Sequence, residues 1–355
     1  MKKLFMAFFC LVALFALASC QQESEQAKEY KLGMGVVVST ESSVDATTAQ
    51  VDATVAAVVL DSEGKIVSCR LDAVQNKITV SETGEVTVPA TFKTKMELGD
   101  DYNMAKYGQS MDWNGDGVVK EWYDQAKAFE AYVVGKTAQE VKDMPTKVVE
   151  GSGYIISAED ALLSAGCTIQ ITDFKAAVAK ACEDAQGTTF TTASAFTLGV
   201  AANSFDDGST NATADAAGSV KVYSDFAASV VVDGKIVASL NDAIQPSFAV
   251  STTGALTASY TATKRELEED YNMAKYGQSM DWNGDGQVKE WYLQSAAFSA
   301  YVVGKTAQEV LDMPTKVVEG AGYVISAEDA LLSAGCTIQI TAIKAVVAES
   351  VNNAR

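Results

Sequence analysis

The chain contains a long internal repeat, and this feature restricts the possible folds more than any other. Residues 101–172 align without a gap with residues 270–341 at a constant offset of 169. Only eight positions differ, and in the first copy they are Val118, Asp124, Ala126, Lys127, Glu130, Lys142, Ser152 and Ile155. Nearly identical sequences fold alike, so we expect two similar units in tandem.

Looser similarity extends the repeat upstream. Gly64-Lys65-Ile66-Val67 pairs with Gly234-Lys235-Ile236-Val237, and Asp72-Ala73-Val74-Gln75 pairs with Asp242-Ala243-Ile244-Gln245. We therefore predict a repeat domain at 32–186, a linker rich in Thr and Ser at 187–195, and a second repeat domain at 196–355. Domains of about 150 residues are long enough to bury a core of their own.

The first twenty residues have the pattern of an export signal. Lys2 and Lys3 precede an apolar run from Leu4 to Leu17, which is shorter than the roughly 20 residues of a membrane-spanning helix. The run ends in Leu17-Ala18-Ser19-Cys20, which resembles the lipobox of bacterial lipoproteins and implies cleavage before Cys20 and diacylation of its sulfur. We predict a signal peptide at 1–20, a polar tether at 21–31 and a lipid anchor that holds the protein at a cell membrane, facing away from the cytoplasm. The alternative is an ordinary secretory signal with a chance cysteine.

Composition excludes several classes of function. The formal net charge is −19, with 46 acidic and 27 basic residues, and no basic patch occurs, so we expect no nucleic-acid partner. The chain has no histidine, which excludes Ser-His-Asp triads, Cys-His dyads and histidine zinc sites. The cysteines after Cys20 are Cys69, Cys167, Cys182 and Cys336, and we predict small buried side chains rather than reactive thiols.

Hydrophobic periodicity changes halfway through each copy. In the first copy, β-rich runs at 54–60, 65–71, 77–80 and 85–91 are separated by turn residues, which predicts an antiparallel β-meander. Helical spacing begins at Lys120 and ends at Gly135, and Thr137 opens a capping box before a second short helix. Ser157 resembles a further cap, Cys167 to Ile171 could be a strand, and Thr172 can cap a last helix at 174–181. Strands followed by helices predict an α+β fold in each repeat.

The loop Asp-Trp-Asn-Gly-Asp-Gly occurs once in each copy. Oxygen side chains at loop positions 1, 3 and 5 followed by glycine match the first half of an EF-hand calcium loop. The candidate Ca²⁺ ligands are Asp112, Asn114, Asp116, Asp281, Asn283 and Asp285. Position 12, where a bidentate glutamate is expected, is Tyr123 or Tyr292, so we predict weak binding. The alternative is a turn before a helix.

Aromatic and basic residues around this loop are candidates for ligand contact. All four tryptophans flank it, and Trp113 and Trp282, which lie in the polar loop itself, are the candidates for stacking on a flavin or a sugar ring. Trp122 and Phe129 have helical spacing and are expected in the core. Lys95 and Lys264 precede an Asp-Tyr-Asn-Met sequence in each copy and could contact a phosphate, or could simply be solvated.

The end of each repeat resembles a flavin-binding family. Gly166-Cys167-Thr168-Ile169-Gln170-Ile171 resembles a motif in the FMN-binding domain of bacterial electron-transfer lipoproteins and quinone-reductase subunits. In that family the motif reads Ser/Thr-Gly-Ala-Thr, and its last threonine carries FMN through a phosphoester bond. The resemblance implies FMN attachment at Thr168 and Thr337, beside Gly166 and Gly335. Cys167 and Cys336 replace the alanine of the family motif.

Three functions are consistent with these features. The first is a pair of flavin-associated modules that pass electrons to a redox partner or carry a flavin or another ligand. The second is a binding or structural surface lipoprotein without a cofactor, which calcium could stabilise. The third is a hydrolase, which ranks last because the chain has no histidine base and no pair of acidic residues with distinctive spacing.

Overall fold

The computed structural model describes residues 26–107, 117–148, 156–160, 163, 166–185, 187–259, 261–276, 286, 288–317, 325–329 and 335–355. Within these residues the protein is a mixed α+β structure, and every strand pairing is antiparallel. The predicted α+β class and the predicted antiparallel pairing are therefore confirmed.

The first half begins with four strands, and helices with shorter strands follow them. Its strands are β1 (Lys28–Ser39), β2 (Thr48–Leu60), β3 (Ile66–Val80), β4 (Val86–Thr87), β5 (Thr146–Val148), β6 (Ile156–Ala158) and β7 (Thr188–Thr192). Its helices are α1 (Lys95–Leu98), α2 (Trp122–Val133), α3 (Ala138–Lys142) and α5 (Thr172–Asp184), with 3-10 turns η1 (Gly99–Tyr102) and η2 (Met104–Tyr107).

The second half has a similar order of elements. Its strands are β8 (Thr197–Asp206), β9 (Gly218–Val232), β10 (Lys235–Ile244), β11 (Ser247–Val250), β12 (Leu256–Ala258), β13 (Thr315–Val317) and β14 (Ile325–Ala327). Its helices are α6 (Lys264–Leu267), α7 (Trp291–Tyr301), α8 (Ala307–Leu311) and α10 (Thr341–Asn352), with 3-10 turns η4 (Glu268–Tyr271) and η5 (Met273–Tyr276).

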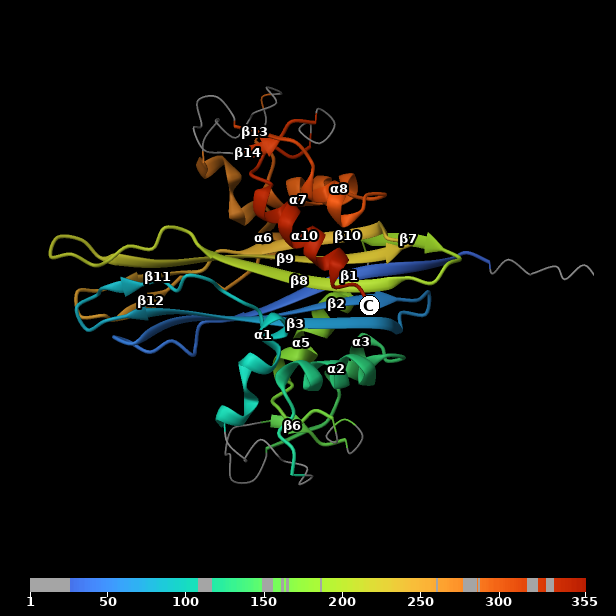
Figure 1. Cartoon of the computed structure of the whole chain (residues 1–355), viewed down its shortest axis with the longest axis horizontal. Helices are drawn as coiled ribbons and strands as arrows, with labels where there is room; N and C mark the ends of the chain where they lie inside the picture. The colour runs from blue at the N-terminus through green and yellow to red at the C-terminus, as the bar shows by residue number, and fades with distance from the viewer. Residues whose placement is uncertain are drawn as a thin grey trace, which may run out of the picture.

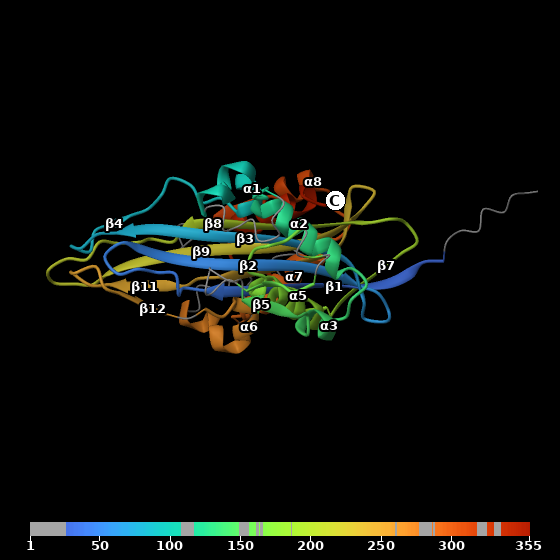
Figure 2. The same cartoon turned by 90° about the horizontal axis from the view of Figure 1, so that it is seen from below.

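The two main sheets lie face to face, and helices cover their outer faces. The first sheet has the strand order β4-β3-β2-β1-β7. The second sheet has the order β10-β9-β11-β12, and β8 is its fifth strand and also pairs with β9. Helix α5 packs on β1 and β2, whereas α10 packs on β8 and β9. Figure 1 shows the helices of the two halves on opposite sides of the paired sheets, and Figure 2 shows the strands of both sheets running along one long axis. The layers are thus helices, sheet, sheet and helices.

Strand β2 shows why both faces of the sheets are buried. Successive side chains of a strand point to opposite faces. Val55 and Ala57 face the second sheet, and the neighbouring Ala56 and Val58 face the helices of their own half. Besides one helix–sheet core in each half, the molecule therefore has a third core between the sheets, made of side chains from both halves. The sequence pattern predicted only one core for each domain.

Two glycines allow the long helices to lie directly on the sheets. A Cβ atom on Gly33 of β1 would lie 1.9 Å from the carbonyl oxygen of Ala181, and one on Gly199 of β8 would lie 1.8 Å from that of Ser350. No side chain fits in such a gap. The same close approach between helix and sheet is present in both halves.

Two predicted connecting segments contain strands instead. Strand β1 begins at Lys28, inside the predicted tether, and β7 lies inside the predicted linker and pairs with β1. The ring of Tyr30 stacks on Phe190 at 5.6 Å and meets Phe196 at 5.1 Å, which fixes β1 beside the start of the second half. The polar residues around these aromatic side chains concealed both strands in the sequence.

The predicted helices are confirmed, whereas the strand predicted at the end of the repeat is not present. Helix α2 ends before Gly135, which has a φ of 85°, and Thr137 forms the predicted capping box with Glu140. Residues 167–171 are not a strand: the side chain of Gln125 binds their backbone in place of a neighbouring strand. The last helix begins at Thr172 itself, and its N-cap is Ile171, not Thr172.

Proline causes one difference between the sheets. Strand β3 runs without a break through Asn76, but in the second half Pro246 separates β10 from β11. Proline lacks the N–H that a ladder requires, so the strand is interrupted there. The break lies next to Gln245, which lines the cavity described below.

Candidate functional site

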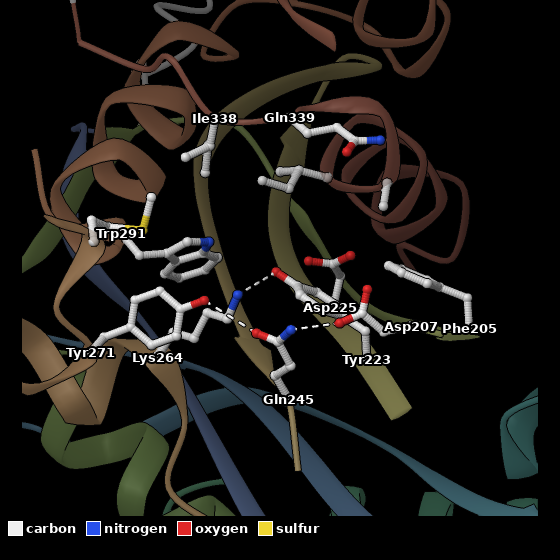
Figure 3. Close-up of a pocket in the computed structure, with 13 residues that line it drawn as sticks. Phe205, Asp207, Tyr223, Asp225, Gln245, Lys264, Tyr271, Trp291, Ile338 and Gln339 are labelled. Carbon is white, nitrogen blue, oxygen red and sulfur yellow. Dashed lines mark hydrogen bonds between the residues drawn. The ribbon is translucent and has the colours of Figure 1, made fainter. Parts of the chain in front are cut away.

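A cavity of about 270 Å³ lies in the second half, between the outer face of the sheet and the helices that cover it. It is lined by Phe205, Asp207, Tyr223, Asp225, Gln245, Lys264, Tyr271, Met273, Trp291, Ile338, Gln339, Ala342 and Ile343. Figure 3 shows the Lys264 amine at its centre, with Trp291 and Tyr271 on one side and Tyr223 and Asp225 on the other.

The start of α6 positions Lys264. Thr263 caps this helix by accepting a hydrogen bond from the backbone N–H of Glu266, whose side chain in turn accepts one from the backbone N–H of Thr263. A carboxylate from β10, Asp242, accepts a further hydrogen bond from the backbone N–H of Arg265 at 3.1 Å. Since the first turn of α6 is attached to the sheet, the side chain of Lys264 extends into the space between the two layers.

Aromatic rings surround the Lys264 amine. Its Nζ lies 4.3 Å from the ring centroid of Tyr223, 4.5 Å from that of Tyr271 and 5.5 Å from that of Trp291. It also donates a hydrogen bond to the Tyr223 hydroxyl at 2.8 Å. The electron-rich faces of the rings attract a cation, and only 3% of Lys264 is exposed. The amine therefore belongs to the wall of the cavity and not to a solvated surface.

Asp225 supplies a carboxylate with unused hydrogen-bonding capacity. Only 2% of the residue is exposed, and its Oδ2 atom has no hydrogen-bond partner within the described part of the chain. A buried polar atom without a partner costs free energy, so a native structure that keeps one calls for an explanation. Because Asp225 lines the cavity, its carboxylate is a candidate to accept a hydrogen bond from a molecule inside it.

Polar groups continue along one side of the cavity. Gln245 donates a hydrogen bond to Asp207 at 2.6 Å and accepts one from the Tyr271 hydroxyl at 3.2 Å. Phe205 and Tyr223 are partly exposed and stack on each other, with centroids 5.0 Å apart and planes at 12°. An apolar ring face and several hydrogen-bonding groups thus meet in one space.

Burial perturbs both charged groups of the cavity. It raises the pKa of Asp225 to about 7, although the positive charge of Lys264 acts in the opposite direction. It lowers the pKa of Lys264 to about 7, against the attraction of Asp225 and Asp207. Perturbed ionisable groups in a cavity are typical of functional sites.

The same place in the first half has different side chains. Lys95 corresponds to Lys264 and lies 5.0 Å from the ring of Tyr102. Thr54 corresponds to Asp225, because they pair with Ala73 and Ala243 at equivalent positions of the repeat.

Two further positions around Lys95 carry acidic residues. By the same register Asp52 corresponds to Tyr223, and Asp173 follows Thr172 as Ala342 follows Thr341. Burial and the charge of Asp52 raise the pKa of Asp173, while the positive charge of Lys95 lowers it. The first half thus has acidic side chains where the second half has an aromatic and a small one.

The threonines predicted to carry FMN lie in a different environment. Thr168 is 8% exposed and Thr337 is 7% exposed. The Oε1 atom of Gln125 accepts hydrogen bonds from the backbone N–H of Thr168 at 2.8 Å and from its hydroxyl at 3.3 Å, and Gln294 does the same for Thr337. A Cβ atom on Gly166 would lie 2.8 Å from Cβ of Ala128, so this glycine packs against α2. Neither threonine lines the Lys264 cavity.

Several other predicted residues lie outside the described residues. These are Cys20, Trp113 and Trp282 and the six candidate calcium ligands Asp112, Asn114, Asp116, Asp281, Asn283 and Asp285. Gly335 is described, directly before the buried Cys336. Across the described ranges, no group of three acidic or cysteine side chains is placed to hold a metal ion, and no helix is long and apolar enough to cross a membrane.

The sequence pattern indicated part of the cavity but not the rest. It singled out Lys264 as a possible ligand contact but did not identify Asp225 or Tyr223. The sequence did contain a signal for Asp225. This residue comes directly before the apolar strand residues that begin at Phe226, and an ionised side chain is unfavourable inside a buried strand.

The four cysteines after Cys20 are free and buried, as predicted. Comparisons with protein-family models, curated proteins and solved structures gave no match.

Proposed function

We propose that the chain is a lipid-anchored binding protein that holds a small neutral ligand with several hydroxyl groups, such as a monosaccharide, in the Lys264 cavity. Cys20 would anchor the protein to a membrane, on the side away from the cytoplasm. The observation that carries the proposal is at Asp225, a residue that lines the cavity and whose buried Oδ2 atom lacks a hydrogen-bond partner within the described residues.

The size of the cavity favours a single ring. A volume of about 270 Å³ is just below the 300–1,000 Å³ of most pockets for drug-sized ligands. An isoalloxazine ring with a ribityl phosphate needs more space than a monosaccharide. The volume therefore supports a smaller ligand than FMN for this site.

The charges favour a neutral ligand. Asp207 and Asp225 would repel an anion, while Lys264 would repel a cation. A hydroxyl group can donate a hydrogen bond to Asp225 and accept one from Lys264, and the apolar face of a sugar ring can stack on Phe205 or Tyr223. A neutral polyol satisfies the whole set of groups at once.

The test is a binding titration with a matched pair of variants. The purified full chain is titrated with glucose, galactose, mannose and N-acetylglucosamine, and binding is followed by calorimetry. We expect at least one sugar to bind, and Asp225→Ala to weaken that binding by roughly ten- to a hundredfold, because a hydrogen bond to a charged group is lost. Thr54→Ala, a substitution at the equivalent position of the first half, should leave the affinity unaltered. Absence of binding for all four sugars, or equal affinity for Asp225→Ala, would refute the proposal.

FMN attachment at Thr168 or Thr337 stays a separate prediction. Both hydroxyls donate to a buried glutamine, so attachment would require these segments to open. The mass of the mature chain, produced in a host that contains a flavin transferase, tests it directly. An added FMN on either threonine would support the flavin function, and a colourless protein of unmodified mass would exclude covalent attachment.

A further inference from the structure

The Lys264 amine is placed to react, not only to bind. It lines a cavity large enough for a small molecule, yet it is buried among rings and donates one described hydrogen bond, to the Tyr223 hydroxyl. The carboxylate of Asp225 lines the same cavity. We infer that Lys264 captures small aldehydes and ketones in this cavity as an imine, with Asp225 as the group that transfers protons.

The reaction needs no oxidant, reductant or cofactor. The nitrogen of the neutral amine attacks the carbonyl carbon, a C–N bond forms, and the proton released from nitrogen moves to the Asp225 carboxylate. The protonated Asp225 gives this proton to the former carbonyl oxygen, which becomes a hydroxyl. The second N–H proton then reaches this hydroxyl by the same route through Asp225, and the hydroxyl leaves as water while the nitrogen lone pair forms the C=N bond. One amine and one carbonyl compound thus give one imine and one water, and nothing is oxidised or reduced.

Two opposing effects decide how much neutral amine is present. The rings of Tyr223, Tyr271 and Trp291 favour the ammonium form, whereas the loss of hydration favours the neutral form. Asp225, Asp207 and Asp242 also act on the amine and stabilise its charge, and Lys275 opposes it. The balance lies on the side of burial, which lowers the pKa of Lys264 to about 7.

A neutral amine at neutral pH separates Lys264 from surface lysines. Burial lowers the pKa of Lys264, so its amine is neutral far more often than that of an ordinary lysine, whose pKa of about 10.4 leaves fewer than about one molecule in a thousand neutral at pH 7. Buried lysines with lowered pKa values are the ones that serve as imine-forming nucleophiles. The burial that removes water from Lys264 therefore increases its reactivity.

The test uses the two lysines as an internal comparison. The purified full chain is incubated with glycolaldehyde and sodium cyanoborohydride at pH 7, so that any imine is reduced to a stable hydroxyethyl-lysine, and modification at each lysine is measured by peptide mass spectrometry. We expect Lys264 to be modified about tenfold or more faster than Lys95 and the exposed lysines. Equal modification of Lys264 and Lys95, or none at Lys264, would overturn the inference.

Two variants separate the roles of the residues. Lys264→Arg keeps the charge and removes the nucleophile, so the modified peptide should disappear, whereas Lys95→Arg should leave the labelling of Lys264 unchanged. Asp225→Asn should slow the reaction by about tenfold or more, because it removes the group that transfers the proton. Unchanged labelling in Asp225→Asn would refute its part in the reaction.

The inference shares the cavity with the proposed function but not its ligand chemistry. Labelling of Lys264 without binding of any sugar would support the reactive amine and reject the sugar-binding function. Sugar binding without selective labelling would do the reverse.

Discussion

Lys95 and Lys264 occupy the same place in two copies of one repeat, but the side chains around them differ. Tyr223, Asp225 and Ala342 leave a cavity beside Lys264, whereas Asp52, Thr54 and Asp173 stand at the corresponding positions near Lys95. The residues that differ lie on the second strand of each half, β2 or β9, and at the start of the last helix. The tyrosine and the tryptophan come from the nearly identical part of the repeat, and the lysine lies just upstream of it. The two halves thus place a cavity beside the lysine in the second copy and acidic side chains near the lysine in the first.

The largest expected effect tests whether the scaffold is the same in both halves. Gly199→Ala would place a methyl group 1.8 Å from a carbonyl oxygen of α10, and Gly33→Ala would place one 1.9 Å from α5. Because backbone cannot move aside easily, we expect each change to lower the free energy of unfolding by about 3 kcal/mol, measured by urea denaturation. Gly187→Ala, which meets no atom within 4 Å, is the control. Retention of full stability by either substituted chain would contradict the close packing of helix on sheet.

The next prediction concerns a buried aspartate that is present at the equivalent position of each half, Asp72 and Asp242. Burial raises the pKa of Asp72 to about 7 and that of Asp242 to about 6. The folded chain therefore binds more protons than the unfolded chain between roughly pH 4 and 7, so the free energy of unfolding falls as pH rises through this range. One unit of pKa corresponds to about 1.4 kcal/mol, so the rise from 3.8 to about 7 sets an upper limit of about 4 kcal/mol on the loss from Asp72, and we expect about half of it, about 2 kcal/mol.

Thermal unfolding between pH 4.5 and 8 checks this dependence. Asp72→Asn and Asp242→Asn should each flatten the decline, because an amide does not titrate in this range. The amide oxygen can still accept the hydrogen bond that the carboxyl oxygen accepts from the following backbone N–H, so the fold should be kept. Stability that rises with pH in the unsubstituted chain would show that these carboxyl groups have ordinary pKa values.

Placing a residue of the first half at the equivalent position of the second half tests directly whether these side chains decide ligand binding. Ala342→Asp puts the acidic side chain of the first half into the cavity, where it would compete for the Lys264 amine and reduce the space. We expect sugar affinity to fall by about tenfold, about 1.4 kcal/mol, in calorimetric titration. Asp173→Ala, the opposite change in the first half, should leave the affinity unchanged. Undiminished affinity in Ala342→Asp would place the ligand elsewhere.

The smallest effect is expected at an ion pair that joins the two halves, between Arg265 and Asp184. Arg265 donates hydrogen bonds to both carboxylate oxygens of Asp184, at 2.7 and 3.2 Å, and the equivalent residue of the first half is Met96. Both side chains are about a quarter exposed, so Arg265→Met should cost less than about 1 kcal/mol. Thermal unfolding in low and high salt measures this, with Met96→Leu as the control. A loss of several kcal/mol would mean that this ion pair holds the halves together.

The repeat explains which parts of the fold could be predicted. Helical spacing from Trp122 to Val133 and the capping box at Thr137 are local signals, and the structure has both elements where the sequence placed them. Strand β1 has no such signal, because glycines and charged residues interrupt it and its stability comes from β2, β7 and a helix far along the chain. The core between the two sheets is equally hidden, since a strand buried on both faces does not alternate.

The candidate site divides in the same way. Lys264 could be noticed because it is repeated, but Asp225 and Tyr223 are not repeated, and only the sheet register brings them to the lysine. The threonine motif at Thr168 was visible for its pattern, yet the buried Gln125 that binds it comes from a separate helix. Sequence patterns thus located residues of unusual type, and tertiary packing decided which of them share a cavity.

The most direct test of the account uses two methionines as reporters. Met273 lines the Lys264 cavity, and Met104 is its counterpart in the first half; each is 3% exposed. In spectra of the chain with ¹³C-labelled methionine methyl groups, addition of the binding sugar should shift the Met273 signal and leave the Met104 signal in place. Shifts of both signals, or of neither at a sugar concentration that saturates the calorimetric binding, would contradict a ligand site confined to the second half.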